Sequence, residues 1–195
     1  MTDRFTRTFI FTLVLTFVFG YFFVNSASAQ RRDFMTDEEI ELIRDSQDID
    51  ARIDVLAKMI DRRFEVLGVE VGGWKQGGKQ SDSWGAAPKG SRLEILSDIK
   101  KLLQKAIDDI DNLSEHPDSA PVREKGDKEA KKDPQRFSVA VRSLGRAAER
   151  YLPAFRSQLD ISNDGMEKGL LLASIDFSNQ IIEAVGKLPP EVRKK

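Results

Sequence analysis

The sequence predicts an all-α protein: a four-helix bundle of the up-down type with two long flexible loops, preceded by an N-terminal signal peptide. Two observations predict this class. Apolar residues return every three or four positions in several long segments, and the two-residue alternation of strands is nearly absent. A helix with one apolar stripe must bury it against another element, so these segments are expected to pack together.

The composition is that of a globular chain without covalent cross-links. The 195 residues include no cysteine, which excludes disulfides and thiolate metal sites. The 31 basic residues nearly balance the 32 acidic ones, so charge gives no reason to expect a nucleic acid as partner. Residues 30–195 suffice for a single helical-bundle domain, which would bury roughly 70% of its unfolded surface.

Residues 1–29 have the three parts of a secretory signal peptide. Basic residues open the segment, an apolar stretch covers residues 8–24, and small residues end it at Ala29. We therefore expect cleavage after Ala29 and a periplasmic or secreted protein. The alternative is a retained segment that tethers the protein to a membrane, although the stretch is short against the about 20 residues that a membrane span needs.

The first helix is expected at about residues 37–67. Thr36 and Glu39 predict a capping box at its start, and Gly68 is the natural stop. Because the polar residues 46–48 prefer caps to helix interiors, we expect either one bent helix or a short helix followed by a longer one. The apolar stripe consists of Ile49, Ile53, Leu56, Ile60, Phe64 and Leu67.

The first long loop, residues 68–90, is rich in glycine and holds both tryptophans, Trp74 and Trp84. A connection of this length is usually functional or disordered. Two interpretations remain open for the tryptophans. They contact a partner, since large flat side chains contribute much binding energy, or one of them folds back and caps the end of the bundle. The loop is accordingly either a binding element or a disordered linker.

The second helix is expected at about residues 91–115, with a capping box from Ser91 and Glu94 and an end before Pro117. The second loop, residues 114–133, mixes charges of both signs with few apolar residues. Such a segment cannot bury enough apolar surface to offset the entropy of ordering, so a mobile surface loop is expected.

The third helix is expected at about residues 133–159, where Asp133 and Pro134 form a typical start. The fourth is expected at about residues 164–187 and ends at Gly186. Both segments carry apolar residues at helical spacing, which completes the set of four stripes that a bundle needs.

The residue types disfavour most metal and catalytic sites. Di-iron bundles use paired Glu-x-x-His motifs, but His116 is the single histidine and lies beside a proline in a linker. Acidic runs such as Asp108-Asp109 lack the spacing of a calcium loop. We expect no catalytic residue, no metal ligand and no cofactor.

A row of arginines occupies one face of the third helix. Arg142, Arg146 and Arg150 recur every four residues. The row would attract phosphate groups or an anionic membrane unless acidic residues of other helices neutralise it, and neutralisation is the favoured alternative.

These observations predict an exported, non-enzymatic binding or scaffold module of the cell envelope, with an unknown protein or envelope component as partner. The rival hypothesis is an extracytoplasmic hydrolase that uses carboxylates between helices. A buried carboxylate pair with raised proton affinity would favour it. A membrane-tethered interaction protein follows if the N-terminal segment is retained.

Overall fold

The computed structural model describes residues 32–74, 81–116 and 134–190. The regular secondary structure of these residues is helical and includes no strand, which confirms the all-α prediction. All of these helices belong to one compact unit, Phe34–Lys195. The expected signal peptide at residues 1–29 lies outside the described residues.

The described chain contains five α-helices and one short 3-10 helix, η1. Their bounds are α2 (Asp37–Asp45), α3 (Ile49–Val66), η1 (Ser81–Trp84), α4 (Arg92–Glu115), α5 (Pro134–Ile161) and α6 (Gly165–Gly186). The first expected loop contains η1, and its residues 75–80 lie outside the described residues. Residues 117–133, most of the second expected loop, lie outside them as well.

The segment expected as the first helix forms two helices in the structure. α2 ends at Asp45, and Ser46 leaves the helical conformation with φ −82° and ψ 81°. α3 follows Asp48, whose backbone is extended. Of the two alternatives that the polar residues 46–48 leave open, the structure has the short helix followed by the longer one.

Both predicted capping boxes are confirmed. At the start of α2, the Glu39 amide donates to the Thr36 hydroxyl at 3.3 Å, and the Thr36 amide donates to the Glu39 carboxylate at 3.0 Å. At the start of α4, Ser91 and Glu94 exchange the same two bonds at 3.3 and 2.7 Å. Each box satisfies backbone amides that have no partner inside the helix.

The predicted stop at Gly68 is also confirmed. Gly68 has φ 69°, a conformation that costs a residue without Cβ little. Its amide donates to the Glu65 carbonyl, and the Val69 amide donates to the Phe64 carbonyl, both at 2.9 Å. These two bonds satisfy carbonyls of the last turn of α3 and direct the chain away from the helix axis.

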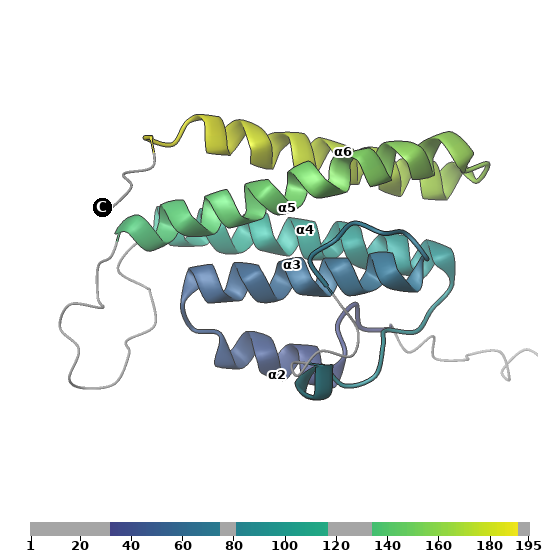
Figure 1. Cartoon of the computed structure of the whole chain (residues 1–195), viewed down its shortest axis with the longest axis horizontal. Coiled ribbons are helices and arrows are strands. Elements are labelled where there is room, and N and C mark those ends of the chain that lie inside the picture. Colours follow the sequence, from purple (N-terminus) through teal and green to yellow (C-terminus); the bar gives the residue numbers. More distant parts are fainter. Residues whose placement is uncertain (1–31, 75–80, 117–133, 191–195) are drawn as a thin grey trace, which may run out of the picture. The chain divides into compact units, whose positions relative to one another are not determined.

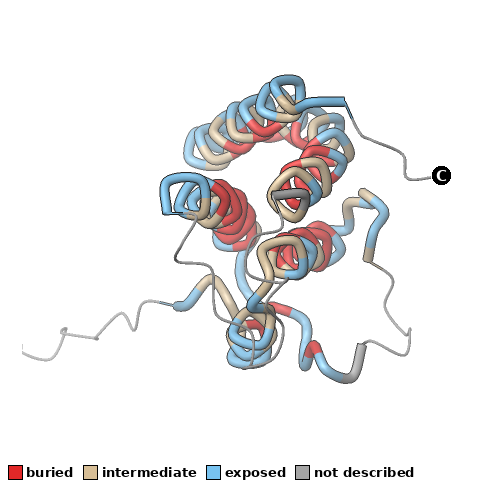
Figure 2. The backbone as a smooth tube through the Cα atoms, turned by 90° about the vertical axis from the view of Figure 1, so that its left-hand side faces the viewer, coloured by how far each residue is buried: buried red, intermediate tan, exposed pale blue. Residues whose placement is uncertain are grey.

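Successive helices from α3 to α6 run in opposite directions along the unit (Figure 1). α3 and α6 each pack against both α4 and α5, while α2 packs against α3. The end view shows the buried residues of these helices facing one another (Figure 2). α2 and α6 therefore lie on opposite sides of the unit.

The core combines a cluster of aromatic rings with many aliphatic side chains. Phe64 of α3 lies 5.3 Å from Tyr151 and 5.2 Å from Phe155 of α5, measured between ring centroids. The same core includes aliphatic side chains of α3, α4 and α5, among them Ile53, Leu56, Ile60, Ile95, Ile99, Leu102, Leu103 and Leu144. α6 contributes Leu171 and Ile181.

Candidate functional site

The two tryptophans singled out in the sequence lie in contact with each other. The rings of Trp74 and Trp84 meet edge to face, with centroids 5.2 Å apart. The Arg62 guanidinium lies 5.4 Å from one ring centroid and 5.5 Å from the other, within the range of cation–π attraction. Trp84 is buried, whereas Trp74 is half-buried. Of the pair, only Trp74 therefore keeps substantial surface for a partner.

Arg62 connects the tryptophans to α2 and to the chain after η1. Its Nη1 donates to Glu39 Oε1 at 2.8 Å. Its Nη2 donates to the carbonyl oxygens of Gly85 and Ala86 at 3.3 and 2.8 Å. Burial lowers the pKa of the Arg62 guanidinium, and the Glu39 carboxylate opposes that shift. The side chain is 4% exposed, so its charge depends on Glu39 rather than on water.

Glu39 also binds Arg63, the next residue of α3. Arg63 Nη1 and Nη2 donate to the two oxygens of Glu39 at 2.8 and 2.7 Å, which is a bidentate pair. The same guanidinium donates to the carbonyls of Phe34 and Met59. Its Nε lies 3.8 Å from Asp98 Oδ2 and makes no hydrogen bond. The Glu39 carboxylate thus caps α2 and binds two buried arginines, and Asp98 supplies the second negative charge that balances them.

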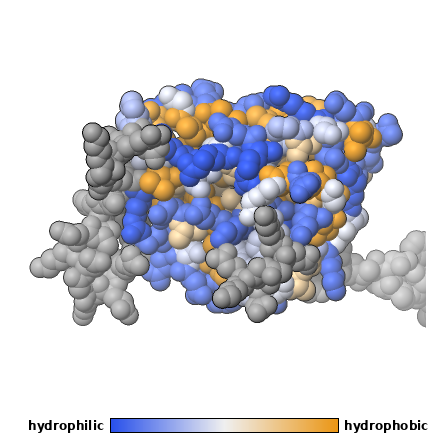
Figure 3. All heavy atoms as spheres, viewed as in Figure 1, coloured by the Kyte–Doolittle hydropathy of each residue, from blue (hydrophilic) through white to orange (hydrophobic). Residues whose placement is uncertain are grey.

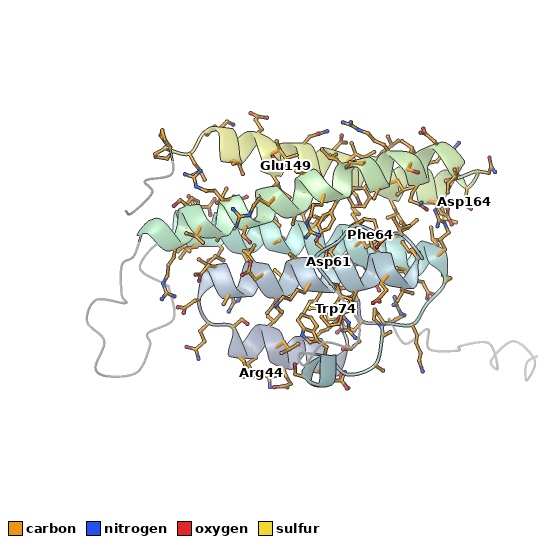
Figure 4. The ribbon with its side chains drawn as sticks, viewed as in Figure 1. Arg44, Asp61, Phe64, Trp74, Glu149 and Asp164 are labelled. Carbon is orange, nitrogen blue, oxygen red and sulfur yellow. The ribbon has the colours of Figure 1, made fainter. Side chains whose placement is uncertain are left out.

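A second buried charge, Asp61, lies on α3 beside α5 (Figure 4). The Tyr151 hydroxyl donates to Asp61 Oδ1 at 2.8 Å, with the Ala57 carbonyl oxygen 3.0 Å away. Arg150 donates to both oxygens of Asp61 at 3.3 and 3.4 Å. Burial raises the pKa of the Asp61 carboxyl, an effect that Tyr151 and Arg150 partly oppose. Burial also raises the pKa of Tyr151 well above its usual value.

The loop after α3 lies against this ion pair. Arg150 Nη1 donates to the carbonyl oxygens of Val71 and Gly72 at 3.0 and 2.6 Å. Gly73 has φ 88°, and a Cβ built on it would lie 2.2 Å from Asp61 Oδ2. The backbone can approach the carboxylate this closely only because the residue is glycine.

The arginine row of α5 is divided among different roles. Arg150 pairs with Asp61, as described above. Arg142 donates to the carbonyl of Pro189, beyond the end of α6. Arg146 is exposed. Because two of the three guanidiniums bind groups of the same chain, the row does not form a uniform basic surface.

The surface of α6 is of a different kind. Met166 and Leu172 are exposed by 66% and 51%, and Ile161 at the end of α5 is exposed by 64%. A Cβ built on Gly165 or Gly169 would meet nothing within 4 Å. Figure 3 shows hydrophobic side chains reaching the surface along the edge where α6 lies. This group, Ile161, Gly165, Met166, Gly169 and Leu172, is called the α6 surface below.

The part of the chain that the structure describes contains no group of three acidic or histidine side chains that could hold a metal ion. His116 is the C-cap residue of α4. Over the same residues, no helix combines the length and the apolar character needed to cross a membrane.

Sequence reasoning missed the buried charges, although a signal for them exists. From Ile53 onward the core positions of α3 follow spacings of three and four, and Arg63 stands three residues after Ile60. In α4, Asp98 stands in the same way three residues after Ile95. A charged residue at core spacing predicts a buried ion pair, because an unpaired charge there would be too costly.

Comparison of the chain with protein-family models, with curated proteins and with solved structures gives no match in any of the three.

Proposed function

We propose that this chain is an exported, non-enzymatic binding or scaffold module of the cell envelope, periplasmic or secreted. Export is supported by residues 1–29, which combine a basic start, an apolar stretch and a small-residue end. N-terminal sequencing of the exported protein tests this part. A start at Gln30 supports cleavage after Ala29, whereas a start at Met1 supports the membrane-tethered alternative.

The architecture proposed for this module is an up-down four-helix bundle formed by α3, α4, α5 and α6. Their alternating directions and their packing around a common core support it. The connection between α5 and α6 is short, as expected for antiparallel neighbours. α2 is an addition on the outside of α3.

The observation that carries the binding role is the α6 surface. Its three large apolar side chains, Ile161, Met166 and Leu172, are exposed to water, and exposed apolar surface commonly takes part in protein interactions. The exposed charged residues of α6 are few, and they carry both signs: Lys168, Asp176 and Glu183. Contact there would be apolar rather than electrostatic. Gly165 and Gly169 leave room for close approach. The partner expected is therefore a protein that presents an apolar helix.

A matched pair of variants tests this role. Met166→Glu with Leu172→Glu places charge on the α6 surface, and Val139→Glu makes the same change at an exposed apolar position of α5. The tagged mature chain is cross-linked in the envelope fraction. A protein bound by the wild type and Val139→Glu but lost from the double variant supports the proposal. Identical binding by all three chains contradicts it.

One observation favours the rival hydrolase hypothesis. Asp61 is buried with a raised pKa, as a general acid would be. Its contacts, however, are Tyr151 and Arg150 rather than a second carboxylate. Glycoside and ester substrates test the rival: hydrolysis by the wild type that disappears in Asp61→Asn would support it and contradict the non-enzymatic proposal.

A further inference from the structure

Residues 71–74, called the strap below, follow α3 in the chain and are not helical. Side chains of α3 and α5 hold them in place. The carbonyls of Val71 and Gly72 accept hydrogen bonds from Arg150. The backbone of Gly73 lies directly against the Asp61 carboxylate. At its end, Trp74 packs on Arg62 and on the other tryptophan.

Arg150 joins a buried group to this strap. Its side chain is 35% exposed, whereas the Asp61 side chain is 2% exposed. The guanidinium also lies 5.2 Å from the Tyr151 ring centroid. An arginine half in water has many alternative conformations, so its position depends on the buried carboxylate beside it.

We propose that the ion pair between Asp61 and Arg150 is an acid-sensitive latch that holds the strap, and that protonation of Asp61 releases the strap while the helices stay folded. A neutral Asp61 no longer attracts the guanidinium, which then turns toward water. The two carbonyls of the strap lose their donor, and Trp74 becomes accessible.

Asp61 is the group in this cluster that acid neutralises, and burial raises the pKa of its carboxyl above the usual value. The charged and titratable groups that act on it are Lys58 of α3 and Arg150 and Tyr151 of α5. Lysine and arginine stay positive in acid, and tyrosine stays neutral. The strap contributes backbone groups at Gly73. Protonation therefore leaves two cations without the anion between them.

The direction of the Asp61 pKa shift distinguishes release of the strap from unfolding of the whole protein. Burial raises the pKa of Asp61 above its usual value, so the folded chain takes up this proton more readily than the unfolded chain. The contribution of Asp61 to stability is fully present below its unfolded pKa and is lost as the pH rises through its folded pKa. Acid thus loosens the strap without unfolding the protein through this group.

Tryptophan fluorescence of the full chain provides the test, because its two tryptophans are both in this loop. Acrylamide quenching is measured from pH 7 to about pH 4, with far-ultraviolet circular dichroism as the check on helicity. The quenching constant is expected to rise about twofold or more as the strap opens locally, at constant helicity. An unchanged constant over this range, at constant helicity, would overturn the proposal.

Variants distinguish the latch from a general effect of acid. Asp61→Asn should show the high quenching constant already at pH 7 and no further rise. Asp54→Asn makes the same change on α3 at a carboxylate that accepts from Ser143, and it should titrate like the wild type. If Asp61→Asn does not fold, Arg150→Gln removes the donor to the strap and should be open at pH 7. A folded Asp61→Asn or Arg150→Gln that titrates like the wild type would contradict the latch.

Discussion

The two sides of the unit differ in how their surfaces are covered. On the side of α2, two segments are bound to α3 through its buried arginines: Glu39 of α2 accepts from Arg62 and Arg63, and the chain after η1 accepts from Arg62. On the side of α6, Ile161, Met166 and Leu172 are exposed, and no described residue lies within 4 Å of a Cβ built on Gly165 or Gly169. Buried ion pairs therefore stabilise the side of α2, whereas the side of α6 is the one that the proposed binding role uses.

The largest loss of stability is expected from a change at Glu39, the carboxylate that binds both buried arginines of α3. Glu39→Gln removes the negative charge but keeps the shape. It leaves Arg62 buried without its anion and leaves Arg63 with Asp98 at 3.8 Å as its remaining carboxylate. Loss of one partner from a buried pair costs about 3–5 kcal/mol of unfolding free energy. Urea unfolding followed by circular dichroism measures it.

Glu41→Gln is the matched control, since Glu41 pairs with Arg44 on the exposed face of α2. An exposed pair contributes roughly 0–1 kcal/mol. Equal losses of stability in the two variants would mean that Glu39 is not the charge that holds this side together.

The next effect concerns the contact between α5 and α6. A Cβ built on Gly145 would lie 2.4 Å from Cγ2 of Val185. Gly145→Ala must therefore push the helices apart, at a cost of about 1–3 kcal/mol despite the better helix propensity of alanine. Thermal unfolding measures the change. A stability equal to or above that of the wild type would show that Val185 moves aside without cost.

A smaller and pH-dependent effect is expected at Tyr151. Tyr151→Phe removes the hydroxyl that donates to Asp61, at a cost of about 1–3 kcal/mol at neutral pH. The pKa of Asp61 should rise further, because the donor that opposes burial is gone. The variant should therefore lose less stability near pH 4, where Asp61 is closer to neutral, than at pH 7. Urea unfolding at both pH values measures this. Equal losses would contradict the charge-stabilising role of the hydroxyl.

These cases also show how far the sequence predicts the molecule. The helices follow from apolar spacing, and their ends follow from Thr36, Ser91 and Gly68, because caps are local and involve residues three or four positions apart. The pairing of Glu39 with Arg63 joins residues 24 positions apart. Local patterns show that Arg63 occupies a core position, but they do not identify which carboxylate reaches it.

The α6 surface illustrates a second limit. Leu172 belongs to an apolar run, and apolar spacing alone assigns such a residue to the core. The structure leaves it 51% exposed because α6 packs on α4 and α5 along one face only. How many neighbours a helix has is decided by the arrangement of all the helices, which no single segment encodes.

The smallest predicted effect is a gain in stability rather than a loss, and it tests the α6 surface directly. Gly169 lies inside α6 and has open space where a Cβ would be, so Gly169→Ala should stabilise the fold by about 0.5–1 kcal/mol. A glycine at this position leaves room for the backbone of a partner to come close. The same variant should therefore weaken binding of the partner captured through the α6 surface, although its melting temperature rises. Stability and binding that rise together would mean that nothing packs against Gly169.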